Sequence, residues 1–198
     1  MNMHKRLALA AATAALGGIG ALATPAATAS AVPDTHSVFA AQSRQAGLTA
    51  AQNAELQRQV NTTIAESGGR QVAANIVDLG HGDSVRLVVP GEKYVRDLAT
   101  TRGPVTSSTA AHVCPTGDFC AYTAVNYGGR EQRMGPCGKH PLDGSGWSGA
   151  GSWYNNQTQS WMVATMWGKN GEFVYRDNGP GSHDTHGNWA KVWSITNC

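Results

Sequence analysis

Two short groups of residues carry the side chains that could do chemistry in this sequence. Cys114 and Cys120 bracket Pro-Thr-Gly-Asp, so an oxidised pair would close a small, turn-containing loop. The stretch from His183 to His186 reads His-Asp-Thr-His after a run of Gly, Asn and Pro, which predicts a loop. Two imidazoles three positions apart can reach one ion, but zinc needs a third ligand and none is close in sequence. We therefore expect no metal, no cofactor and no catalytic residue.

Charge and motif content exclude several function classes. The sequence contains no Gly-x-Ser-x-Gly, no His-Glu-x-x-His and no phosphate-cradling glycine loop, so we expect a protein that is not an enzyme. The formal charge of +2 comes from Lys5 and Arg6 at the start of the chain, and the remainder is neutral. A neutral chain without a basic run has no electrostatic attraction to nucleic acid.

The start of the chain predicts export. Residues 1–31 combine a basic start, an Ala- and Leu-rich apolar run and a small-x-small site at Ala29-Ser30-Ala31, which is typical of a signal peptide. A membrane anchor is the alternative, but the run is short and is followed by Pro25. We expect a secreted, extracellular protein that starts at Val32, has no membrane contact after signal cleavage and is a monomer. An even number of cysteines, four, suits an oxidising destination.

Composition divides the exported chain into three parts. All six tryptophans and all four cysteines lie after residue 113. Residues 32–98 therefore form one region and residues 114–198 another, and residues 99–113 are rich in Thr, Ser and Ala, which indicates a protease-accessible linker.

The first region predicts a small α+β unit, a helix plus a hairpin. Thr49 and Gln52 have the spacing of a capping box, and apolar residues at helical spacing run to Gly68-Gly69. Residues 72–79 suggest one strand and residues 85–89 a second, with a turn between them. About 65 residues with few large apolar groups make a marginal core. Two interpretations stay open, a small accessory domain and a propeptide that is removed.

The second region predicts an all-β domain. No window has a convincing helical period, and turn-forming pairs separate short β-prone runs, which favours a sandwich or barrel. The six tryptophans supply most of the core, and one or two could be exposed for binding. The candidate strands are 119–124, 130–134, 151–154, 160–166, 172–176 and 191–196.

The four cysteines allow three pairings. Cys114–Cys120 with Cys137–Cys198 is favoured slightly because the first pair closes the Pro-Gly turn, and Cys120–Cys137 across a hairpin is the alternative. Either pairing stabilises the fold rather than supporting redox chemistry, since no Cys-x-x-Cys is present.

The sequence from Cys114 onward resembles a known family. Cys-Pro-x-Gly-x-Phe-Cys-x-Tyr overlaps Tyr122-x4-Tyr127-x-Gly129, and a Gly-Ser-Trp-Tyr run follows that contains Ser152 and Trp153. This pattern is similar to secreted actinobacterial peptidase inhibitors of the streptomycete metalloproteinase-inhibitor type. The resemblance implies a βγ-crystallin-like Greek-key sandwich, in which Tyr122, Tyr127, Gly129, Ser152 and Trp153 form the fold motif.

The resemblance also implies a function and a partner. Such inhibitors present a rigid, disulfide-braced loop to the cleft of an extracellular zinc metalloprotease. The contact candidates here are the turn residues Pro115, Thr116, Gly117 and Asp118 and the loop residues His183 and His186. The short second disulfide loop of that family is absent, so no reactive bond can be transferred. A non-catalytic binding or structural module of crystallin type, for a cell-wall glycan, a protein or calcium, is the alternative.

Overall fold

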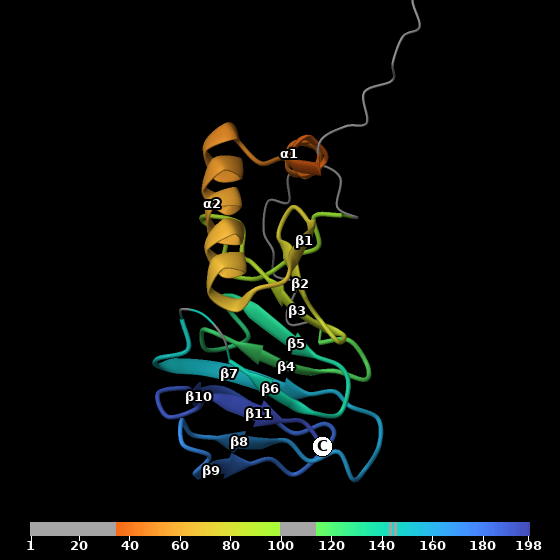
Figure 1. Ribbon diagram of the computed structural model, residues 1–198, viewed down its shortest axis with the longest axis vertical. Helices are drawn as coiled ribbons and strands as arrows, with labels where there is room; N and C mark the ends of the chain where they lie inside the picture. Colours follow the sequence, from red (N-terminus) through yellow and green to blue (C-terminus); the bar gives the residue numbers. More distant parts are fainter. Residues whose placement is uncertain (1–34, 100–113, 143, 145) are drawn as a thin grey trace, which may run out of the picture. The chain divides into compact units, whose positions relative to one another are not determined.

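The computed structural model describes residues 35–99 and 114–198, except Asp143 and Ser145. The predicted signal peptide and almost all of the predicted linker therefore lie outside the described residues. What is described is mostly β-sheet with two helices, and every strand pairing is antiparallel (Figure 1).

Two helices begin the described chain, α1 (Thr35–Gln45) and α2 (Ala50–Ser67). The capping box of α2 is present, since the Thr49 hydroxyl accepts from the Gln52 amide and the Gln52 side chain accepts from the Thr49 amide. Leu56 and Val60 are buried along one side of α2. The prediction of one helix was wrong, because Val38 and Phe39 are the only large apolar residues of α1 and, being adjacent, show no helical spacing in the sequence.

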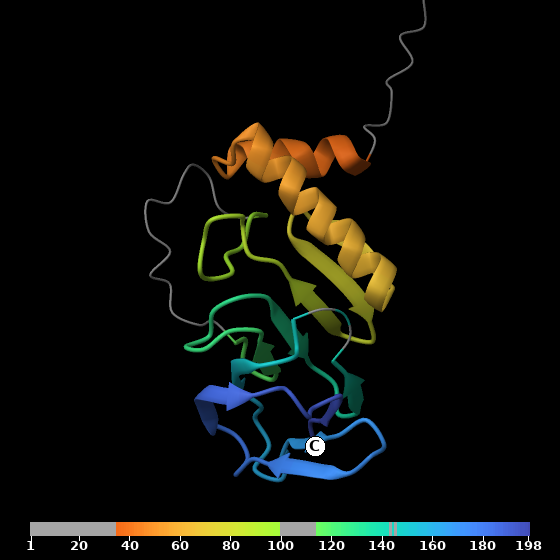
Figure 2. The same cartoon turned by 90° about the vertical axis from the view of Figure 1, so that its left-hand side faces the viewer.

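Three strands follow the helices, β1 (Arg70–Ala73), β2 (Ile76–Gly80) and β3 (Asp83–Arg86). The sequence predicted a single strand over 72–79, but the chain turns at Ala74 and Asn75. The buried Asn75 side chain donates to the carbonyl oxygens of Leu87 and Arg96, at 2.9 Å each. This buried amide fixes the turn through partners that are distant in sequence. Figure 2 shows α2 running alongside these strands.

The larger sheet has seven strands in the order β1-β2-β3-β5-β4-β7-β10. It contains β4 (Phe119–Tyr122), β5 (Glu131–Met134), β7 (Ala150–Asn155) and β10 (His183–Asn188). The β3–β5 ladder pairs Ser84 with Arg133 and Arg86 with Glu131. One sheet therefore runs through both regions that composition distinguishes.

The smaller sheet has four strands in the order β6-β11-β8-β9. Its strands are β6 (Lys139–Pro141), β8 (Thr165–Trp167), β9 (Phe173–Arg176) and β11 (Ser194–Thr196). The sequence missed β6 and β10, because β6 contains a proline and β10 reads His-Asp-Thr-His-Gly-Asn, without an apolar residue.

The described residues form three hydrophobic clusters, two large ones and a small one of Cys114, Cys120 and Tyr122. The first is built from aliphatic residues of α2, β2 and β3, with Phe39 and Leu98. The second draws Phe119 and Trp153 from the larger sheet and Met166 and Ile195 from the smaller one, and it includes Trp147 and Trp189. The two sheets thus share an apolar layer, as a sandwich requires.

Candidate functional site

The structure joins Cys114 to Cys120 and Cys137 to Cys198, which is the first of the pairings that the sequence left open. The first disulfide encloses a tight turn in which the Asp118 amide donates to the Pro115 carbonyl at 3.1 Å. Gly117 has a φ of 101°, a backbone conformation that favours glycine. Within the turn the Thr116 side chain is exposed, and Pro115, Gly117 and Asp118 are partly buried.

Asn156 fixes this turn from the end of β7. Its carbonyl accepts from the Gly117 amide at 2.8 Å, and its amide donates to the Asp118 carbonyl at 2.9 Å. Its side chain donates to the Cys114 carbonyl at 2.7 Å. Together with the disulfide, these hydrogen bonds hold the turn both at Cys114, before it, and at Gly117 and Asp118. The turn can therefore present Thr116 to a partner without first becoming ordered.

A folded hairpin follows β4 and contains the tyrosine motif. Asn126 and Tyr127 have φ values of 55° and 60°, in the left-handed region, and Gly129 has 76°. A Cβ on Gly129 would lie 2.4 Å from the Thr123 hydroxyl, so only glycine fits there. The Ser152 hydroxyl accepts from the Tyr127 amide at 2.8 Å and donates to the Ala124 carbonyl at 2.7 Å. The serine thus fastens the hairpin to β7.

The tyrosines of this motif pack together beside the disulfide. The Tyr122 and Tyr127 rings meet edge to face at 5.5 Å between centroids, and Tyr127 meets Tyr154 in the same way at 6.5 Å. Trp153 lies on the opposite side of its strand and stacks on Phe119 in the second hydrophobic cluster, at 5.8 Å. Of the five predicted motif residues, the structure brings Tyr122, Tyr127, Gly129 and Ser152 together and places Trp153 in the core.

The two candidate histidines lie in strand β10, not in a loop as predicted. His183 pairs with Tyr154, which pairs with Cys120, so His183 lies two strands from the disulfide turn. Its ring stacks on Tyr154 at 5.7 Å with 19° between planes. His186 is exposed, and its ring nitrogen contacts the Thr185 hydroxyl at 2.9 Å. Within the described ranges no three His, Cys, Asp or Glu residues are placed to hold a metal ion.

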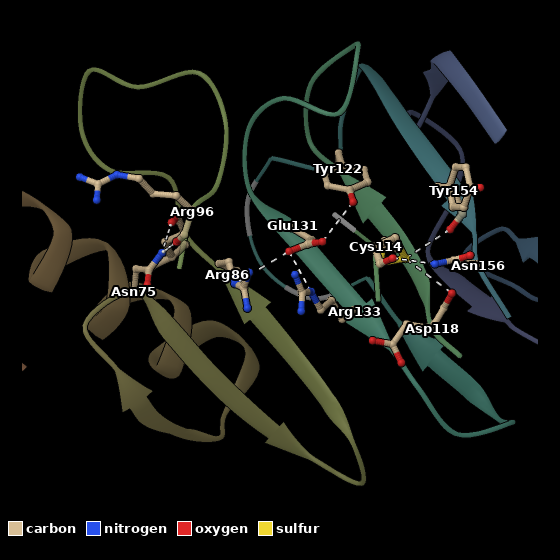
Figure 3. A network of polar contacts seen from close by, with 12 residues as sticks. Asn75, Arg86, Arg96, Cys114, Asp118, Tyr122, Glu131, Arg133, Tyr154 and Asn156 are labelled. Atoms are coloured by element: carbon tan, nitrogen blue, oxygen red, sulfur yellow. Dashed lines mark hydrogen bonds and ion pairs between the residues drawn. A yellow bond between two sulfur atoms is a disulfide. The ribbon is translucent and has the colours of Figure 1, made fainter. Parts of the chain in front are cut away.

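Buried charges occupy the β3–β5–β4 part of the same sheet (Figure 3). The fully buried Glu131 accepts from the Tyr122 hydroxyl at 3.0 Å. It also forms ion pairs with Arg133, whose Nε lies 2.9 Å from Glu131 Oε2, and with Arg86, whose Nε lies 4.0 Å away. Burial raises the pKa of Glu131, and the two guanidinium groups act against that rise. Burial, together with the neighbouring Glu131, raises the pKa of the Tyr122 hydroxyl.

Sequence reasoning did not single out this cluster, although Glu131 and Arg133 stand two apart in a predicted strand and so share one face. Only the β3–β5 pairing, which a sequence does not reveal, adds Arg86 from the first region. Because Glu131 has no exposed surface, it is not placed to meet a substrate, and its polar contacts are with residues of the same sheet.

A comparison with known protein families finds a match in the middle of the chain. Residues 107–173, about one third of the sequence, match the family model of peptidase inhibitor family I36. The matched segment includes the Cys114–Cys120 turn, the tyrosine hairpin and Ser152, so the resemblance predicted from these residues is confirmed. No curated protein and no solved structure matches the chain. His183, His186 and Cys198 lie outside the matched segment.

None of the helices in the described part is long and apolar enough to cross a bilayer.

Proposed function

We propose that the exported chain is a monomeric, secreted inhibitor of an extracellular zinc metalloprotease. The observation that carries this proposal is the peptidase-inhibitor match over residues 107–173, which contains the disulfide-braced turn. Inhibition by docking needs no catalytic group and no cofactor. It needs a rigid surface that keeps its shape in a protease cleft.

The turn from Pro115 to Asp118 is the docking element of this proposal. The disulfide and the Asn156 hydrogen bonds remove its freedom before binding, so less entropy is lost when a protease closes on it. Thr116 is its exposed tip, and His183 supplies a second contact from β10 of the same sheet. His186 is the outermost contact candidate, on the same strand.

The tyrosine hairpin supports a βγ-crystallin-like motif as the scaffold of this site. A hairpin with left-handed residues at Asn126 and Tyr127, bonded to a serine on a neighbouring strand, is a compact and strongly specified unit. We take this unit as half of a Greek-key arrangement that places the disulfide turn at one end of the sheet.

The direct test is titration of the chain that starts at Val32 against thermolysin, a zinc protease, and subtilisin, a serine protease. We expect inhibition of thermolysin at a molar ratio near one, and no inhibition of subtilisin. Thr116→Arg should weaken inhibition by about tenfold or more, as truncated or blocked central contacts do in other interfaces. Thr62→Arg, at another exposed threonine, on α2, is the matched control.

Two outcomes contradict the proposal at different levels. If the chain inhibits neither protease, the assigned target class is wrong. If it inhibits thermolysin and Thr116→Arg inhibits equally well, the function stands and the disulfide turn is not the docking element.

A second candidate function rests on exposed aromatic side chains. Phe173, Trp161 and Trp193 are 63%, 60% and 52% exposed, and the Lys169 ammonium lies 4.8 Å from the Trp193 ring centroid. Exposed rings of this kind suit a non-catalytic module that binds a cell-wall glycan. Retention on insoluble peptidoglycan or chitin, lost in Trp193→Ala, would favour this function over inhibition.

A further inference from the structure

His140 on β6 has an unusual set of neighbours. The side chain is buried, and both ring nitrogens are engaged: Nδ1 lies 2.6 Å from Asp83 Oδ2, and Nε2 lies 3.0 Å from both Pro136 O and Asn197 Oδ1. Two of these three partners are oxygens that can only accept, a carboxylate and a backbone carbonyl. The third partner is the Asn197 side chain, which can present either a donor or an acceptor, so its orientation determines whether Nε2 must carry a proton.

The orientation of the Asn197 side chain is fixed by its other contacts. Its Oδ1 accepts from the Gly138 amide at 3.0 Å, and its Nδ2 donates to the Met134 carbonyl at 3.2 Å. In the flipped orientation Nδ2 would face the Gly138 amide, donor against donor, and Oδ1 would face the Met134 carbonyl, acceptor against acceptor. Asn197 therefore presents an oxygen to His140, and the imidazole faces acceptors on both sides. Only the doubly protonated ring, the imidazolium, donates to all of them.

These contacts tie together segments that are far apart in the sequence. Asp83 begins β3 in the first region, and Asn197 precedes Cys198, which is bonded to Cys137. His140 itself belongs to the smaller sheet, whereas β3 belongs to the larger one. The imidazole thus connects the β2–β3 hairpin, the smaller sheet and the end of the chain.

The carboxylate of Asp83 depends on this imidazole. Its second oxygen, Oδ1, is buried and has no hydrogen-bond partner in the part of the chain that the structure describes. The pKa of Asp118 is raised mainly by burial and further by the nearby Asp83. The side chains of His81 and Lys139 line a cavity of about 310 Å³ together with Asp83 and His140. Burial alone lowers the pKa of His140, but the bonds to Asp83, Asn197 and Pro136 outweigh it, so the pKa is raised overall.

We propose that protonated His140 is a clamp that fastens the β2–β3 hairpin to the C-terminal end of the chain and opens when the ring loses its proton. A neutral imidazole has one N–H, so a lone pair would face either the Asp83 carboxylate or the two oxygens at Nε2. Since the folded state holds the proton more tightly than the unfolded chain, the clamp contributes fully below about pH 6.5. Its contribution is lost as the pH rises through the higher folded pKa of His140.

Hydrogen exchange of the β2–β3 amides tests the clamp on the chain that starts at Val32. After correction for the intrinsic pH dependence of exchange, protection should fall between pH 5.5 and pH 9. The fall should be about tenfold for each unit by which folding raises the pKa of His140. His140→Gln should abolish this pH dependence. His81→Asn, in the turn of the same hairpin, removes an exposed histidine and should leave the pH dependence unchanged.

Equal pH dependence in the wild type and in His140→Gln would overturn the proposal, as would pH-independent protection in the wild type. If His140→Gln does not fold, Asp83→Asn removes the carboxylate and should lower the pKa of His140 measured by NMR. The NMR titration of the wild type decides independently, because an imidazole that is already neutral at pH 6 contradicts the clamp.

Discussion

The two regions of this protein are stabilised by different means. The first region, residues 35–98, packs aliphatic side chains such as Leu56, Val60 and Val77 beneath α2 and contains no cysteine. The second, residues 114–198, packs tryptophans between two sheets and is crosslinked twice. The first region has only three short strands, and the last of them, β3, pairs with β5 of the second region.

The difference shows that a boundary in composition need not be a boundary in structure. A three-stranded sheet with one helix face buries little apolar surface, so a region of this size gains stability from a neighbour. Here the neighbour supplies a strand ladder, the carboxylate of Glu131 for Arg86 and the imidazole of His140 for Asp83. In return, the first region covers the edge of β5 that would otherwise be unpaired.

The two disulfides should differ most in their contribution to stability. Replacing Cys137 and Cys198 with serine should lower the free energy of unfolding by about 4 kcal/mol, because their loop spans 61 positions. Replacing Cys114 and Cys120 should cost about 2.5 kcal/mol, because their separation is 6. Urea unfolding followed by tryptophan fluorescence measures both. A larger loss for the short loop would show that the turn stabilises more than its loop length predicts.

The buried carboxylate at the junction should have the next largest effect. Glu131→Gln removes the negative charge that two largely buried guanidinium groups share, and we expect a loss of about 3 kcal/mol. Both regions should then melt at the same lowered temperature, when followed by far-UV circular dichroism for the helices and by fluorescence for the tryptophans. Glu172→Gln, at an exposed position, is the control and should change stability by less than about 0.5 kcal/mol. Separate melting of the two signals would mean that the regions are not coupled.

The helix cap should have the smallest effect, and it is confined to the first region. Thr49→Ala removes the side-chain oxygen that accepts from the Gln52 amide and should cost about 1 kcal/mol. Thr62→Ala in the exposed middle of α2 is the matched control, where alanine is tolerated or preferred. Equal losses in the two variants would argue against the capping box.

What the sequence could predict was local. The capping box of α2 follows from Thr49 and Gln52, and the short disulfide follows from the turn between Cys114 and Cys120. The residues of the tyrosine hairpin were singled out because Tyr122, Tyr127 and Gly129 have the spacing of the fold motif that the family resemblance implies. Such features depend on residues within about ten positions of one another, so their pattern is written in one window.

What the sequence could not predict depends on distant partners. Asn75 fixes a turn through carbonyl groups of Leu87 and Arg96, and β10 is a strand only because β7 pairs with it. The alignment of Arg86 with Glu131, and of Asp83 with His140, requires the β3–β5 register and the fold of the smaller sheet. Polar residues with such roles have the same appearance in a sequence as residues of a solvated surface.

The most direct test of the account is whether the two regions stay together when the chain between them is cut. A site for a specific protease would be inserted into residues 100–113, which lie outside the described residues, and the purified chain would be cleaved there. Because the β3–β5 ladder joins the two regions, both pieces should elute as one species in gel filtration without denaturant, at the volume of the uncut protein. Elution as two separate species would contradict the account, and would favour a propeptide that leaves the inhibitor region once it is cut.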